Sequence, residues 1–323
     1  MTLDEEVLKC ISMPCYSPLR IRNPALESSP DKSRERRIKK IGTRRQLEEL
    51  NGYLRVYIDV PCGKCFGCMR MRCEGWVFRH LLELKQCTSA HFVTLTYDDE
   101  HIPISPSGML VFNKSHVQKY IKRVRKYLER YKIKIKYHVA SEYGDTFGRP
   151  HYHMLLYNYP LENADVDKLA LLWEYGNVQI GTVTEASIRY VVEYITQYYY
   201  GETFDEDDSK PFALYSKNLG NASYKAVADY ILASGIKLYN IDGKYYRVPS
   251  SFIGLLLDKN FLSPLQVQRL ADNAQNYYAE NLESIREDCE NRGISPYCSE
   301  RDWVTAKARQ QRKRYELRKS SKY

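Results

Sequence analysis

The chain has 323 residues, of which 43% are hydrophobic and 28% charged, so it holds enough apolar side chains for a folded core. Its mean hydropathy is −0.56, and no apolar run approaches the length of a membrane-spanning helix. The acidic N-terminus lacks the apolar segment of a secretory signal. We therefore expect one large domain or two, acting in the cytoplasm without a membrane partner.

The formal net charge of +9 is concentrated in two short segments. Residues 32–45 carry eight basic residues and one acidic residue, and residues 301–323 carry nine basic and two acidic residues. Runs of this kind release counterions when they contact phosphates, so they favour a nucleic-acid partner. The candidate contacts within them are Arg36, Arg37, Lys39, Lys40, Arg312, Lys313 and Arg314.

Cysteines cluster in the run CGKCFGCMRMRC, which begins at Cys62. In a chain without an export signal, closely spaced cysteines indicate a metal site rather than disulfides. The spacing predicts a structural Zn²⁺ that anchors the N-terminal segment, with an iron–sulfur cluster as the alternative. Three ligands would be Cys62, Cys65 and Cys68, and the fourth would be Cys15, Cys10 or Cys73.

The periodicity of apolar residues predicts strands and helices from residue 69 onward. Strands are expected at residues 91–97, 134–142, 151–157 and 176–183. Helices are expected at residues 69–86, after a cap at Ser115, and at residues 165–174, 187–199 and 264–290. Hairpins of strands with helices between them favour an α+β fold, with helices on one face of the sheet.

Two histidines, His151 and His153, lie two residues apart on a predicted strand and so project from one face. Glu142 ends the preceding strand, and the turn after it brings the two strands together antiparallel. Two imidazoles and a carboxylate would form a site for Mg²⁺ or Mn²⁺. Asp98 and Asp99 are weaker candidates for the same site.

Two tyrosines, Tyr190 and Tyr194, lie four residues apart on a predicted helix and share one face. Beside a divalent cation, a phenolate could attack a phosphodiester and form a phosphotyrosine with a free 3′-hydroxyl. The alternative is an aromatic stripe that only packs on the sheet, since the chain has 29 tyrosines and Tyr198 continues the spacing.

Together these motifs resemble the replication initiators of microviruses, small single-stranded DNA phages, which belong to the HUH superfamily of rolling-circle endonucleases. The matching segments are PCGKCFGC with the helix after it, HFVTLTYDDEHIP, SEYGDTFGRPHYHMLLY and YVVEYITQ, in the family's order over roughly residues 12–200. The resemblance implies a five-stranded antiparallel sheet with RRM-like (HUH endonuclease) topology. It also implies a Cys-rich N-terminal segment and a mostly helical C-terminal region.

The resemblance assigns roles to residues of this chain. His151 and His153 match the His-x-His metal motif, Glu142 matches its acidic partner, and Tyr190 and Tyr194 match the paired tyrosines of the nicking helix. It divides the chain into an N-terminal segment with the zinc clip and a helix, an endonuclease core, a helical accessory region and a basic tail. These regions span residues 1–88, 89–200, 201–300 and 301–323.

One departure from the family pattern concerns charge on the nicking helix. The family's two lysine positions hold Glu193 and Gln197 in this chain. Another cation, Arg189 or Arg149, is expected to contact the DNA phosphate in their place.

The function implied is a rolling-circle replication initiator that nicks and rejoins single-stranded viral origin DNA in the host bacterial cytoplasm. Host helicase and DNA polymerase are the implied partners, and no small-molecule substrate is expected. Three alternatives stay open: a metal-dependent phosphodiesterase with a water nucleophile, a zinc-stapled DNA-binding protein without activity, and an HUH transposase.

Overall fold

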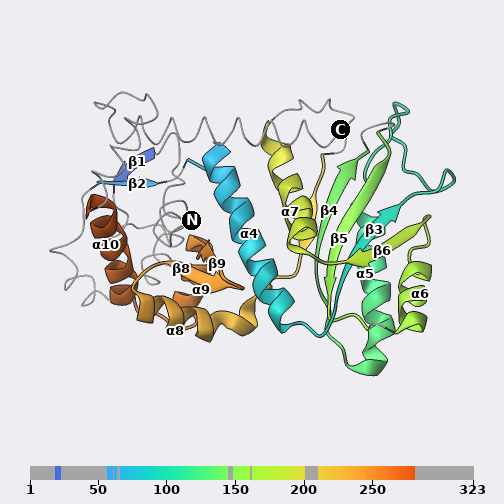
Figure 1. The fold of residues 1–323 in the computed structure, drawn as a ribbon. Coiled ribbons are helices and arrows are strands. Elements are labelled where there is room, and N and C mark those ends of the chain that lie inside the picture. The colour runs from blue at the N-terminus through green and yellow to red at the C-terminus, as the bar shows by residue number, and fades with distance from the viewer. Residues whose placement is uncertain are drawn as a thin grey trace, which may run out of the picture. The chain divides into compact units, whose positions relative to one another are not determined.

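The computed structural model describes residues 19–22, 57–60, 62–63, 66–144, 148–160, 162–200 and 210–280. The chain divides into two compact units, which Figure 1 shows as ribbons. We call residues 76–223 the sheet unit, and residues 1–75 together with 224–323 the accessory unit. The sheet unit contains both motifs to which the sequence assigns chemistry, whereas the domain boundaries expected from the sequence stay predictions.

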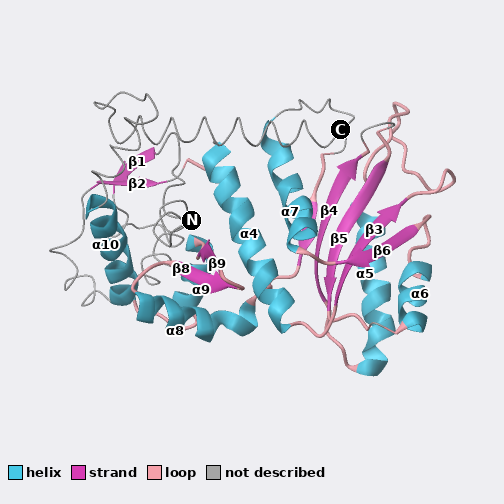
Figure 2. Cartoon of the chain, in the orientation of Figure 1, coloured by secondary structure: helices cyan, strands magenta, loops and turns pink. Residues whose placement is uncertain are grey.

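The sheet unit is built on a five-stranded antiparallel sheet with the order β6-β3-β5-β4-β7. Helix α5 (Lys114–Leu128) connects β3 to β4, and α6 (Asn163–Leu171) connects β5 to β6, so the first four strands have the βαββαβ connectivity of an RRM-like fold. The predicted α+β fold is thereby confirmed (Figure 2). The strands are β3 (Ala90–Thr96), β4 (Lys136–Tyr143), β5 (Pro150–Tyr157), β6 (Val178–Thr182) and β7 (Ala213–Tyr215).

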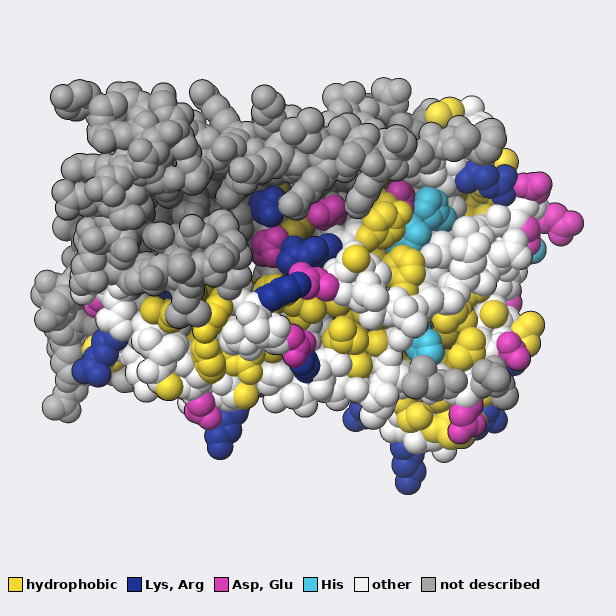
Figure 3. All heavy atoms as spheres, in the orientation of Figure 1, with side chains coloured by type: hydrophobic (Ala, Val, Ile, Leu, Met, Phe, Trp, Pro, Cys, Tyr) yellow, Lys and Arg dark blue, Asp and Glu magenta, His cyan; other side chains and the backbone are white. Residues whose placement is uncertain are grey.

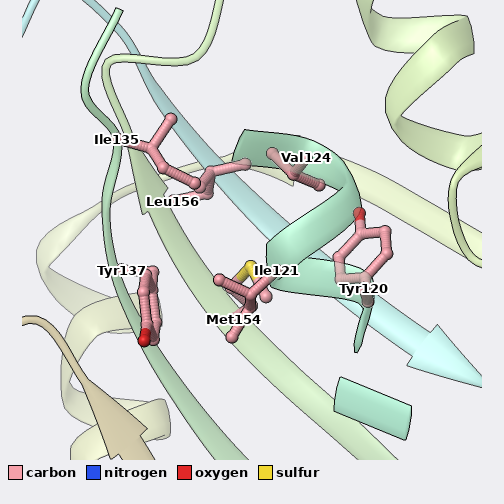
Figure 4. A pocket seen from close by; sticks show the side chains of 7 residues that line it. All are labelled: Tyr120, Ile121, Val124, Ile135, Tyr137, Met154 and Leu156. Atoms are coloured by element: carbon pink, nitrogen blue, oxygen red, sulfur yellow. The ribbon is translucent and has the colours of Figure 1, made fainter. Parts of the chain in front are cut away.

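The main core lies between one face of this sheet and helices α5 and α6. Ile121 and Val124 of α5 pack against Met154 and Leu156 of β5, and all four side chains are buried (Figure 4). Helix α5 begins earlier than expected, because the Asn113 side chain accepts hydrogen bonds from the first free N–H groups. The predicted cap at Ser115 is therefore wrong.

The second face of the sheet is also covered, so the expectation of helices on one face is wrong. Helix α7 (Glu185–Tyr200) packs on β4 and β5, and the C-terminal part of α4 (Phe66–Gln86) reaches the same face (Figure 1). The physical reason is that this face is apolar as well. Ala140, Leu155 and Tyr157 project from it and are completely buried.

A buried polar chain joins α4 to the sheet. His80 contacts the Tyr157 hydroxyl through Nδ1 at 2.9 Å and His138 Nδ1 through Nε2 at 2.7 Å. Nearby, Glu83 binds both Lys136 Nζ at 2.7 Å and the Gly220 amide at 2.8 Å. Because both histidines are fully buried, these hydrogen bonds must replace the water that folding removes.

The accessory unit is mostly helical in its described C-terminal part, as expected. Its helices are α8 (Tyr224–Ser234), α9 (Ser250–Asp258) and α10 (Pro264–Glu280), and β8 (Leu238–Ile241) pairs with β9 (Lys244–Arg247). The predicted continuation of the last helix to residue 290 lies outside the described residues. A strand pair that the sequence did not predict joins β1 (Leu19–Arg22) and β2 (Tyr57–Val60).

None of the helices in the described part of the chain combines the length and the apolar character needed to cross a membrane.

The buried histidine pair predicts a specific loss of stability in acid. Burial lowers the pKa of His80, and it lowers the pKa of His138 from 6.5 to about 3. The unfolded chain therefore binds more protons than the folded protein below pH 6.5. Stability is fully present above that pH and falls as pH drops toward 3, by up to about 1.4 kcal/mol per pH unit for each histidine.

We expect His138→Asn to remove about one proton's worth of this dependence. Urea unfolding between pH 7 and pH 4.5 measures it, with the wild-type chain as reference. An unchanged pH slope in the variant would contradict the assignment.

Candidate functional site

The register of the β4–β5 hairpin brings the predicted metal ligands together. Glu142 pairs directly with His151, and Ala140 pairs with His153, so all three functional side chains lie on the face that α7 covers. Glu142 Oε2 is 3.1 Å from His151 Nε2 and 2.9 Å from His153 Nε2. Among the described residues, these three are the one group of His, Cys, Asp and Glu side chains close enough to hold a metal ion.

The hydrogen bonds around His151 indicate that a cation belongs between the rings and the carboxylate. His151 Nδ1 lies 3.2 Å from the Arg149 carbonyl, which can only accept, so Nδ1 carries the proton. In the neutral ring, Nε2 then presents a lone pair to the ionised carboxylate of Glu142. Two such atoms at 3.1 Å repel each other unless a proton or a metal ion lies between them.

His153 supports the same conclusion. Its Nε2 is buried and has no partner with hydrogen-bond geometry, although Glu142 Oε2 is within 2.9 Å. An orphaned buried nitrogen is costly unless it serves a ligand. The donor set of two imidazoles and one carboxylate therefore fits a divalent cation such as Mn²⁺ or Mg²⁺.

Two residues that the sequence did not single out hold His153 in place. Thr94 Oγ1 lies 3.1 Å from His153 Nδ1, and the Phe92 ring stacks on the imidazole at 5.5 Å between centroids. Both come from β3, which pairs with β5 so that Thr94 lies opposite His153. The strand itself was predicted, but its pairing register was not, and only the register reveals these contacts.

The electrostatics favour an ionised Glu142. Burial alone would raise its pKa, but the imidazole nitrogens of His151 and His153 and the hydroxyl of Tyr194 outweigh burial and lower the pKa of Glu142 to about 2. The carboxylate is therefore negatively charged at neutral pH. It is also the part of the site that would attract a cation.

The two predicted tyrosines both reach this group, but they differ in exposure. Tyr190 is 37% exposed, and its hydroxyl donates to Glu142 Oε2 at 3.3 Å. Tyr194 is 6% exposed and stacks on His153. Burial, with hydrogen bonds to Glu142 and Tyr190, raises the pKa of Tyr194 above its ordinary value.

The sequence of α7 accounts for this placement. Ile188, Val191 and Val192 are buried and fix the helix on the sheet, so residues 190 and 194 turn toward the histidines. The two tyrosine rings meet edge to face at 4.9 Å between centroids. Figure 3 shows histidine side chains at the surface beside hydrophobic ones on the face of the molecule that carries α7.

Other predicted site residues have different partners. Asp98 binds the amide and ring of His101, and Asp99 binds Arg149 at 2.8 Å, so neither lies in the metal-ligand group. Arg189 binds Glu185 one turn earlier on α7.

The structure describes only part of the predicted cysteine and phosphate contacts. Cys62 and Cys68 lie with their sulfurs 3.9 Å apart. Cys15, Cys65 and the predicted basic contacts in residues 32–45 and 301–323 lie outside the described residues.

Removing the hydroxyl of Thr94 should weaken metal binding without touching a ligand. We expect Thr94→Val to lower Mn²⁺ affinity about tenfold, because outer partners of ligating histidines typically contribute that much. Calorimetric titration with Mn²⁺ measures the effect. Thr96→Val on the same strand, whose hydroxyl donates to the Asn177 carbonyl, is the matched control and should leave the affinity unchanged. Equal affinities for the two variants would count against this site.

Comparisons with known proteins agree with the geometry of the sheet unit. Residues 90–198 match the family model for the replication-associated protein ORF2. Replication-associated protein ORF2 of Spiroplasma virus 4 is 36% identical over 154 residues, which is 43% of this chain and 48% of that protein. Replication-associated protein VP4 of Bdellovibrio phage phiMH2K is 32% identical over 152 residues, covering 42% and 47%.

Replication-associated protein ORF4 of Chlamydia phage 1 is 28% identical over 168 residues, covering 46% of this chain and 41% of that protein. The chain thus spans about half the length of the curated relatives it matches. The N-terminal nuclease domain of minute virus of mice non-structural protein 1 is 14% identical with a TM-score of 0.21, covering 58% of this chain and 99% of that domain. A likeness at that score supports no conclusion. Residues 90–198 therefore belong to the replication-associated protein ORF2 family, and the chain's relatives are replication-associated proteins of microviruses.

Proposed function

We propose that the chain is a rolling-circle replication initiator, which nicks and rejoins single-stranded viral origin DNA through a tyrosine nucleophile. One observation carries the proposal: the exposed hydroxyl of Tyr190 lies 3.3 Å from the carboxylate that joins two histidines. A nucleophile, a buried carboxylate and a set of metal-ligating nitrogens thus converge on one sheet face. The replication-associated relatives favour DNA as the substrate.

His151, His153 and Glu142 would hold the divalent cation, Mg²⁺ or Mn²⁺. When bound, such an ion polarises the scissile phosphate and stabilises the charge that develops on it. Glu142 contributes a full negative charge, while Thr94 and the Arg149 carbonyl orient the two rings. Phe92 and Tyr194, which stack on His153, keep water from that side of the site.

The proposed chemistry exchanges one phosphodiester for another. Tyr190 Oη attacks phosphorus, the bond from phosphorus to the 3′ oxygen breaks, and the departing 3′ oxygen takes up a proton as the phenol loses one. The DNA 5′ end stays covalently attached to Tyr190. Because the number of phosphodiester bonds is unchanged, the free energy for rejoining is retained and no nucleotide cofactor is required.

The unequal exposure of the tyrosines gives them an order. Tyr190 meets solvent and makes the first cut, whereas Tyr194 is buried and has a raised pKa. Tyr194 would act only after its hydrogen bonds to Glu142 and Tyr190 are released. A second tyrosine within reach of the same site suits the rejoining step, which must attack while the first tyrosine is occupied.

Contacts with the DNA backbone are proposed for Arg149 and Arg189. Their ion pairs with Asp99 and Glu185 are partly exposed, and such pairs contribute only about 0–1 kcal/mol, so a phosphate can replace either partner. The basic segments at residues 32–45 and 301–323 are proposed to add phosphate contacts. Host helicase and polymerase are the proposed partners in the host cytoplasm.

Tyr190→Phe should abolish the covalent protein–DNA adduct, with a loss of at least a hundredfold in the rate of cleavage. The test incubates 3′-labelled single-stranded oligonucleotides carrying the origin with the full chain and Mn²⁺, then separates the products on a denaturing protein gel. Tyr131→Phe is the matched control, because Tyr131 is similarly exposed, at 46%, and lies away from the site.

Each result of this assay separates the candidate functions. Label that migrates with the wild-type protein and is lost in Tyr190→Phe supports the tyrosine mechanism. Cleavage that survives in Tyr190→Phe without an adduct would instead establish a water nucleophile. DNA binding without cleavage by the wild-type protein would establish a binding protein that lacks activity.

A structural Zn²⁺ at the cysteine cluster is a second part of the proposal. The 3.9 Å between the Cys62 and Cys68 sulfurs is close to the separation of two thiolates on one tetrahedral zinc, about 3.8 Å for bonds of about 2.3 Å. Gly63 between them has a φ of +75°, a conformation that lets the chain turn tightly after Cys62. Cys65 and Cys15 are the proposed further ligands.

Elemental analysis tests the zinc site. We expect about one zinc per purified chain, and less than a fifth of that in Cys62→Ser combined with Cys68→Ser. Cys87→Ser is the control, since its thiol donates to the Leu84 carbonyl at the other end of α4. Equal zinc content in all three proteins would refute the site.

A further inference from the structure

Helix α5 and the residues after it form a third basic region, which the two charged segments of the sequence obscured. Residues 114–134 hold nine basic residues and one acidic residue, a net charge of +8. Positive charge is therefore not confined to the two short segments. This region lies on a rigid helix of the sheet unit.

The charged side chains face outward. The core face of α5 holds Val117, Tyr120, Ile121, Val124 and Leu128, all buried. Lys119, Lys122 and Lys126, at three- and four-residue steps, lie on the opposite side and are exposed. We call these three lysines the α5 ridge.

The ridge is not paired with acidic groups. Within the described part of the chain, Lys119, Lys122 and Lys126 form no ion pair. Arg123, on the flank of the helix, differs: it binds the Leu172 carbonyl and Glu174 and so serves the fold. A row of lysines without carboxylate partners leaves its charge available to an external anion.

Position separates this ridge from the candidate catalytic group. Helix α5 packs on the sheet face that carries Met154 and Leu156, whereas His151 and His153 project from the other face. DNA bound to the ridge would therefore be a different segment from the strand held at Tyr190.

We infer that the α5 ridge binds the phosphate backbone of double-helical DNA, and this choice of ligand rests on the proposed function. Lys119 to Lys126 spans about 10 Å of helix, and one DNA strand presents about three phosphates over that length. No aromatic side chain interleaves the ridge, so it lacks the stacking platforms that single strands require. The guanidinium of Arg130 lies over Tyr127 and Tyr131 beyond the end of α5, and it covers the aromatic faces there.

The test compares two triple variants of the full chain that lose the same charge. One replaces Lys119, Lys122 and Lys126 by Gln, and the control replaces Lys217, Lys225 and Lys259, which are exposed outside α5. The probe is a blunt 20-base-pair duplex without origin sequence, and its binding is followed by fluorescence anisotropy between 50 and 200 mM salt. Adduct formation on a single-stranded origin oligonucleotide is measured in parallel.

We expect the α5 variant to bind the duplex about tenfold more weakly at 50 mM salt, with its logarithmic salt slope reduced by about 2.7 for three lost contacts. The control should keep the wild-type slope, and both variants should keep adduct formation. Equal losses in both variants would overturn the inference, because net charge alone would then explain binding. An unchanged slope in the α5 variant would also overturn it, and would leave the ridge to an acidic protein surface. Loss of adduct formation in the wild-type chain bears on the proposed function alone, since duplex binding is measured separately.

Discussion

The site depends on one buried carboxylate shared by two imidazoles. Glu142 Oε2 lies about equally far from a nitrogen of His151 and one of His153, and the backbone carbonyl at Arg149 fixes the proton of the first ring on its far side. A negative charge facing two lone pairs in a partly buried place is stable only with a cation or a proton among them. The metal requirement thus follows from hydrogen-bond donors and acceptors, and the cation is the element that the hairpin register prepares.

The same carboxylate makes the two tyrosines unequal. Both hydroxyls approach Glu142, but only Tyr190 is exposed to an incoming strand. A helix with tyrosines four residues apart would otherwise present two equivalent nucleophiles. Burial of Tyr194 against His153 raises its pKa and ties it to the metal ligand, so cutting and rejoining would have a built-in order. The cationic surface at α5 lies on the opposite side of the sheet, which would allow duplex binding and strand chemistry to proceed independently.

Sequence patterns predicted the sheet, its long helices and the residues of the site, because alternation along strands and the two-residue spacing of the histidines are local properties. They did not predict what long-range pairing decides. Thr94 and Phe92 were missed, since their contact with His153 arises from the β3–β5 register. The cover on the second face was missed because Leu155 and Tyr157 read as strand residues without indicating their neighbours. The basic ridge of α5 was hidden by a sum over the rest of the chain, where acidic segments cancelled it.

Mass spectrometry of the covalent product tests the central claim most directly. The wild-type chain is reacted with origin oligonucleotide and Mn²⁺, then digested with nuclease and trypsin, and the peptide that begins at Tyr190 is fragmented. We predict a nucleotide phosphate on Tyr190, with Tyr194 unmodified after a single cut. A modified Tyr194 with an unmodified Tyr190 would contradict the proposed order, and a cleaved oligonucleotide without any modified tyrosine would contradict the tyrosine mechanism itself.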